Sequence, residues 1–166
     1  MTDPLRVDIQ HALEGSLDPN LCEECACSLL RDEWPSLVPM PGGDDAGVDG
    51  LVATPDEPPI GLVCTTSKDG ALRNLRDSLS RHKGSGGTVR RVIFATSRRL
   101  SPPECRNLHR RAEELGFNLL QIYQQQAFVD RLYHNPEWRR HLLGLSGAPS
   151  ALSRTRAFGD PRWRSR

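Results

Sequence analysis

Two short stretches, the mostly apolar residues 60–65 and residues 89–96 with their apolar run at 92–95, constrain the fold of this chain more than any other feature. Each has the length of a buried strand and is too short for a buried helix. Between them, leucines recur at helical spacing over residues 71–82, which predicts a helix. A strand, a helix and a second strand form a parallel pair with a right-handed crossover. The sequence therefore predicts an α/β fold.

Other segments extend this pattern in both directions. Ser101 opens a Ser-Pro-Pro-Glu capping box with proline at the first helical position, and Gly116 ends the helix that follows. Early strands joined by short polar connections predict an antiparallel meander. The order is α-β-β-β-α-β-α-β-α, a mixed five-stranded sheet flanked by helices. The expected strands are 36–40, 48–53, 60–65, 89–96 and 117–123, and the other expected helices are 21–30, 126–133 and a short one at 136–143.

The length and composition fit one domain. A chain of 166 residues can bury one sizeable core, and we assign residues 1–147 to it. Residues 148–166, rich in Ser, Pro, Arg and Gly, read as a basic tail or the start of a linker. Apolar runs are too short to span a bilayer, and no apolar leader opens the chain. We therefore expect a cytoplasmic protein without membrane contact.

The charges are divided unevenly along the chain. Residues 1–69 carry 14 acidic and three basic side chains, whereas residues 70–166 carry 19 basic and seven acidic ones. An acidic site facing a basic surface would suit a metal-dependent enzyme that acts on a polyanion. Two halves that neutralise each other where they touch would give the same division. Charge alone leaves both interpretations open.

Three of the five cysteines lie together at Cys22, Cys25 and Cys27. A structural zinc site would need a second Cys or His pair at a suitable spacing, and the sequence has none. The segment also has the apolar spacing of a helix. We expect these cysteines to be small buried thiols.

A motif with chemical content lies between the first expected helix and the strand at 48–53. It reads Gly-Gly-Asp-Asp-Ala-Gly-Val-Asp-Gly over residues 42–50, after a helix that carries Glu23 and Glu24. With the apolar strand that follows, it resembles the PD-(D/E)XK restriction-endonuclease-like superfamily. The resemblance covers about residues 19–130 and is closest to the Mrr-like branch and to nuclease-like domains at the N-termini of multidomain defence ATPases. It implies a restriction-endonuclease-like core.

The resemblance also implies a metal site and an activity. The anchoring ligand of Mg or Mn would be Asp49, and Glu23, or its neighbour Glu24, would assist. A divalent ion in such a site polarises the phosphate and activates the attacking water. The implied protein is a nuclease that acts on DNA or other nucleic acid as an effector module of a defence or DNA-processing protein. It would work as a homodimer and be fused or bound to an ATPase.

The third strand departs from the family pattern of an acidic residue, a spacer and a lysine. Val63 occupies the second ligand position, and Thr65 occupies the lysine position. Lys68 could supply the missing cation from a shifted position, with Asp69 or Arg73 contributing from the next helix. Two functions therefore remain open. One is a slow Mg- or Mn-dependent endonuclease; the other is a catalytically degenerate nuclease fold that binds DNA or a protein partner.

Basic side chains favour nucleic acid in either case. Residues that bracket the buried strand, or lie on the helix before it, are expected to meet phosphates, namely Arg73, Arg76, Arg90, Arg91, Arg98 and Arg99. A flavodoxin-like domain is the remaining alternative from strand–helix alternation. It is disfavoured because no Gly-rich loop follows the first strand and the early strands are too closely connected.

Overall fold

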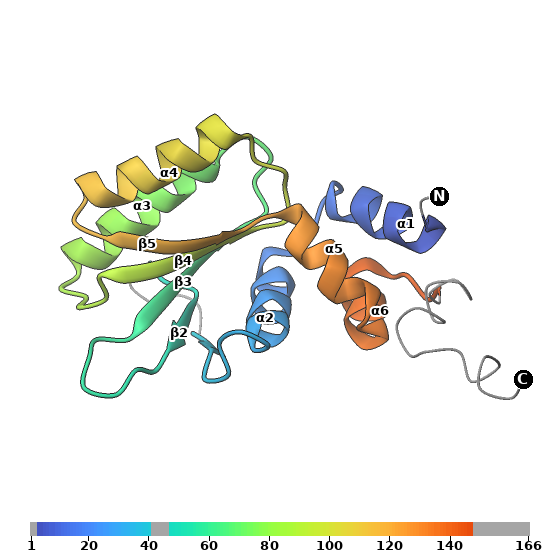
Figure 1. The fold of residues 1–166 in the computed structure, drawn as a ribbon, viewed down its shortest axis with the longest axis horizontal. Coiled ribbons are helices and arrows are strands. Elements are labelled where there is room, and N and C mark those ends of the chain that lie inside the picture. The colour runs from blue at the N-terminus through green and yellow to red at the C-terminus, as the bar shows by residue number, and fades with distance from the viewer. Residues whose placement is uncertain (1–2, 41–46, 148–166) are drawn as a thin grey trace, which may run out of the picture.

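A five-stranded mixed sheet runs through the structure, a computed structural model that describes residues 3–40 and 47–147 (Figure 1). The first three strands pair antiparallel, and the last three pair parallel. The predicted change from a meander to parallel strand–helix units is confirmed. In spatial order the strands are β1 (Val38–Pro39), β2 (Gly50–Val52), β3 (Ile60–Thr65), β4 (Arg91–Thr96) and β5 (Asn118–Tyr123).

The described residues form six helices, which lie on the two faces of this sheet and at its end. Two of them, α3 and α4, pack together over one face, while α2 packs on the other face and contacts α5 and α6 at the end of the sheet (Figure 1). In the part of the chain that the structure describes, no helix is long and apolar enough to cross a membrane. The helices are α1 (Pro4–Leu13), α2 (Pro19–Leu30), α3 (Ala71–Gly84), α4 (Pro102–Glu114), α5 (Gln125–Tyr133) and α6 (Pro136–Leu143).

The first helix, α1, is absent from the predicted order, which was therefore incomplete at its start. The Asp3 carboxylate caps the helix by accepting the Leu5 N–H at 2.9 Å, and a proline occupies the first turn. Leu5, Ile9 and Leu13 share one face at a spacing of four and are buried. They pack near α5 and α6, from the far end of the chain.

Local signals elsewhere placed the element boundaries well. The capping box at the start of α4 is confirmed, since Ser101 accepts the Glu104 N–H and Glu104 accepts the Ser101 N–H. The first two strands are shorter than the predicted 36–40 and 48–53. In the two-residue edge strand β1, Pro39 has no N–H to donate, and the Met40 N–H after it donates to the Asp49 carbonyl at 2.9 Å.

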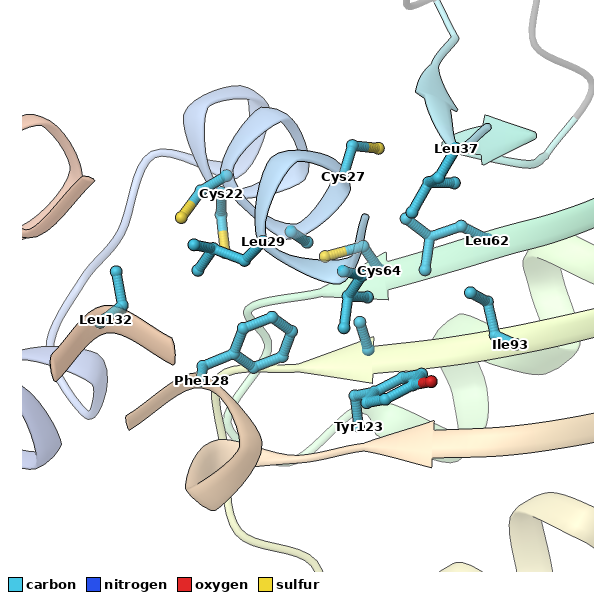
Figure 2. Packing of buried hydrophobic residues seen from close by; sticks show 14 of the residues in the cluster. Cys22, Cys27, Leu29, Leu37, Leu62, Cys64, Ile93, Tyr123, Phe128 and Leu132 are labelled. Carbon is cyan, nitrogen blue, oxygen red and sulfur yellow. The ribbon is translucent and has the colours of Figure 1, made fainter. Parts of the chain in front are cut away.

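The central strand β3 is buried along its whole length. Leu62 and Cys64 belong to the apolar cluster beneath α2, whereas Val63 belongs to the cluster beneath α3 and α4. Figure 2 shows the first cluster, with Leu62 and Cys64 on the strand below α2. Because successive side chains of a strand point to opposite faces, a strand covered on both faces must be apolar throughout. This explains the uninterrupted apolar stretch in the sequence.

Gly47 packs closely against α3. Its φ is +91°, and a Cβ at this position would lie 2.1 Å from the Ser78 carbonyl oxygen. We expect Gly47→Ala to lower the free energy of unfolding by roughly 3 kcal/mol, because both the backbone and its neighbour would have to shift. Urea unfolding measures this loss.

Gly84 is the matched control, since a Cβ there would meet no atom within 4 Å. Gly84→Ala should change stability by no more than about 1 kcal/mol. Equal effects of the two substitutions would contradict the close packing of Gly47 against α3.

Candidate functional site

Asp49 lies directly before β2 and forms hydrogen bonds to β3 through both its main chain and its side chain. Its N–H donates to the Leu62 carbonyl at 2.7 Å, and its carboxylate Oδ2 accepts the Cys64 N–H at 2.7 Å. The side chain thus replaces a backbone acceptor where the β2–β3 ladder begins. The motif residue with the clearest chemistry therefore contacts the third strand.

Glu23 approaches the same part of β3 from α2. It lines a surface pocket of about 250 Å³ with Pro19, Cys64, Thr65, Thr66, Ser67 and Asn74. Burial raises the pKa of Cys27 to about 12, and the carboxylates of Asp49 and Glu23 add to this rise. The same two carboxylates also help to raise the pKa of Cys64, after its contact with Cys22 and its burial. The negative charges of Asp49 and Glu23 therefore both favour the neutral form of these two thiols.

Lys68 lies beside this pocket and not in it. The side chain is exposed and lines an adjoining hollow of about 380 Å³ at the start of α3, together with Ser67, Asp69, Gly70, Arg73, Asn74 and Asp77. Thr65, at the family's lysine position, is buried, and its hydroxyl accepts the Ser67 N–H at 3.1 Å. This hydrogen bond stabilises the turn after β3. The N-cap of α3 is Gly70, which has no side chain to cap the helix.

The described residues supply only part of the site that the resemblance implies for Mg or Mn. Val63, where the resemblance would require a second ligand, is fully buried among apolar side chains under α3 and α4. Within residues 3–40 and 47–147, no three His, Cys, Asp or Glu side chains form a group that could hold a metal ion. Hard divalent cations need several oxygen ligands. Asp44 and Asp45 of the motif lie outside the described residues.

The four arginines that bracket β4 do not form one patch. Arg90 and Arg91 lie at its amino end, and Arg98 and Arg99 follow its carboxyl end, a separation of about 20 Å for a six-residue strand. At the amino end, Arg90 donates to the Val89 carbonyl at 2.7 Å, and Arg91 pairs with Glu57 at 2.9 Å. These two side chains are therefore committed to contacts within the fold.

The two arginines at the carboxyl end also have structural roles. Arg98 donates to the Thr66 carbonyl at 3.2 Å and to the carbonyls of Glu14 and Gly15, which joins the end of α1 to the end of β3. Arg99 donates to the Gln125 side chain at 3.1 Å. Replacing them would disturb the fold as well as any binding.

The exposed cations of α3 are different. Helix α3 carries four basic residues and one acidic residue, Asp77. One broad face of the helix presents Arg73, Arg76 and Arg81. Arg76 forms an exposed ion pair with Asp77 at 3.1 Å, which contributes little to the stability of the fold. Within the described ranges, Arg73 and Arg81 have no side-chain hydrogen bond or ion pair. They are available to a partner.

One pair of residues was missed by the sequence reasoning. Cys22 of α2 and Cys64 of β3 are both buried, and both line a small cavity of about 10 Å³. A hydrogen bond from Cys64 lowers the pKa of Cys22. The expectation of buried thiols is confirmed for Cys22, Cys25 and Cys27. The pairing has no sequence signal, because it depends on how α2 packs against the sheet.

Comparison of the chain with protein-family models, with curated proteins and with solved structures gives no match.

Asp49 offers a direct test of this geometry. We expect Asp49→Ala to lower the free energy of unfolding by about 1–3 kcal/mol, because the partly buried Cys64 N–H would lose a charged acceptor. Urea unfolding without metal measures it. Glu24→Ala, an exposed change on α2, should stay within about 0.5 kcal/mol. If Asp49→Ala proved equally neutral, the carboxylate would have no part in holding β2 to β3.

Proposed function

We propose that this chain is a nuclease-like domain that binds nucleic acid, preferably duplex DNA, without cleaving it. The observation that carries the proposal is the burial of Val63 at the second ligand position, while a carboxylate oxygen of Asp49 is bonded to the β3 backbone. A site that lacks a second ligand on its central strand is poorly suited to metal-assisted hydrolysis. The fold remains available for binding.

The topology supports a restriction-endonuclease-like core. A helix, an antiparallel three-stranded meander and two parallel strand–helix units follow one another in the order that the resemblance implies. Asp49 and Glu23 also lie where the family would place its acidic residues, before β2 and on the helix that packs against β3. Homodimerisation, an attached ATPase and a role in defence belong to the same proposal.

The binding surface is the outer face of α3. Its four cations and single acid give a local excess of positive charge, whereas α4 beside it carries three bases and three acids. Arginine's planar fork matches phosphate oxygens, and phosphate contacts give affinity without sequence preference. A nucleic-acid backbone lying along α3 would meet Arg73, Arg76 and Arg81 in turn.

Salt-dependent binding tests this surface. We expect the double variant Arg73→Ala/Arg81→Ala to weaken binding to all duplex sequences alike, and to reduce the slope of log K against log salt by about two. Fluorescence anisotropy with labelled duplexes over a salt series gives both quantities.

The matched control is Arg106→Ala/Arg110→Ala, which removes the same charge from exposed positions of α4. It should leave the slope nearly unchanged. Equal losses in the two double variants would mean that overall charge, and not the α3 face, drives the interaction. Absence of any binding by the unaltered protein at low salt would refute the proposal.

Cleavage is tested separately. The protein should leave supercoiled plasmid and single-stranded DNA intact with Mg or Mn, and Mn should not raise its melting temperature, since the described residues hold no group of three His, Cys, Asp or Glu side chains that could bind it. Asp49→Asn and Lys68→Ala serve as parallel samples. Mn-dependent nicking by the unaltered protein that Asp49→Asn abolishes would overturn the non-cleaving assignment. Residual activity lost in Lys68→Ala would assign the shifted lysine.

A further inference from the structure

We propose that two copies of this chain associate through the outer edge of β5, which pairs antiparallel with β5 of the second copy. The inference rests on the proposed function only in that a homodimer belongs to it, and it locates the contact between the two copies. Self-association is measured without nucleic acid, so either proposal can fail while the other stands.

The two edges of the sheet differ in how they are protected. One edge is β1 and the other is β5. Strand β1 has only two residues, and one of them is Pro39. Strand β5 is six residues long and has neither a proline nor a charged side chain. Short length, proline and charge are the features by which edge strands avoid pairing with another chain. The edge that can accept a further strand is therefore β5.

The outer side of β5 has no partner strand within residues 3–40 and 47–147, because β5 is hydrogen-bonded to β4 and lies last in the sheet. The Asn118 N–H, at the start of β5, donates to the Arg90 carbonyl at 2.7 Å, on the β4 side. Main-chain groups of a strand point alternately to its two sides, so a set of them points away from β4. A strand added on that side would pair with this set.

The pairing surface begins after an irregularity. The register between β4 and β5 shifts by one residue between Val92 and Ile93, and Gln121–Tyr123 follow in regular register. A bulge of this kind bends the strand locally. We therefore expect the second copy to pair along the regular part, at the carboxyl end of β5.

Partly exposed apolar side chains lie on both faces of the sheet at this edge. Leu120 packs against the cluster beneath α2, and Ile122 packs against the cluster beneath α3 and α4. Both side chains are only half-buried. The side chains of an adjacent strand would cover the exposed remainder on each face.

The chemistry of β5 fits a second copy of the same strand. Residues 115–129 carry no charged side chain, in a chain that is 26% charged, so pairing two copies places no like charges opposite each other. Gln121 is exposed, and its amide can both donate and accept a hydrogen bond. Such a group can pair with the same group of another copy. A strand selected for a charged partner would instead carry the opposite charge.

The pairing has a consequence for the α3 surface. Two antiparallel copies of one strand are related by a two-fold axis perpendicular to the sheet, which keeps corresponding faces on the same side. Helices α3 and α4 cover one face of the sheet (Figure 1). The dimer would therefore present two α3 surfaces on one side, where a single duplex could meet both.

Sedimentation velocity tests the proposal on the full chain under reducing conditions, from low to high micromolar concentration. We expect a monomer–dimer equilibrium that persists at high salt, because main-chain and apolar contacts are not screened. Hydrogen–deuterium exchange at both ends of the concentration range locates the contact. Amides of residues 118–124 should exchange more slowly in the dimer, whereas those of residues 53–59 should not change.

Two variants receive the same positive charge at exposed glutamines, one on β5 and one on α5. Gln121→Lys should raise the dimer dissociation constant about tenfold, because two like charges meet at the paired edge. Gln126→Lys should change it by no more than about twofold. Circular dichroism checks that both variants fold.

Three outcomes would overturn the proposal. They are a monomer at every concentration, which would leave the edge to a strand of another protein, a dimer in which the β5 amides exchange as in the monomer, and equal weakening by the two variants. If Gln121→Lys failed to fold, the exchange data on the unaltered protein would decide.

Discussion

The burial of β3 on both faces is the constraint on which the rest of the structure depends. Leu62 and Cys64 face the cluster under α2, and Val63 faces the cluster under α3 and α4. A carboxylate at position 63 would enter an apolar interior, where an unpaired charge costs several kcal/mol. The strand that organises the core would therefore make an acidic side chain costly at position 63, where the proposed resemblance would require one.

Asp49 shows how an acidic residue remains useful in such a fold. In a metal site, several carboxylates repel one another until a cation binds, so they weaken the protein without it. Here the carboxylate accepts the Cys64 N–H and supports the junction of β2 with β3. The residue that most resembles a catalytic ligand thus also has a structural role. Its presence in the sequence is compatible with a binding domain as well as with an enzyme.

Much of the architecture could be predicted because its signals are local. Apolar runs identified β3 and β4, and the capping box identified the start of α4. The missed helix α1 packs on α5 and α6, so its burial depends on contacts across the whole chain. The contacts of the arginines could not be predicted from the sequence for the same reason. Arg98 was correctly placed after β4, yet its partners include carbonyls at the end of α1, which only the folded chain brings near.

Part of the uneven charge along the chain is neutralised by ion pairs within the fold. Arg131 pairs with Asp32 at 2.9 Å and with Glu33 at 2.7 Å, and Arg91 pairs with Glu57, so bases of the later part meet acids of the earlier part. Charge asymmetry along a sequence is therefore weak evidence for a polyanionic ligand. A polyanionic ligand is favoured where basic side chains remain in excess after these ion pairs have formed. In the described part of the chain, α3 retains that excess, because a single acid accompanies its four cations. Any nucleic-acid interface should accordingly be centred on α3 and not on the arginines around β4.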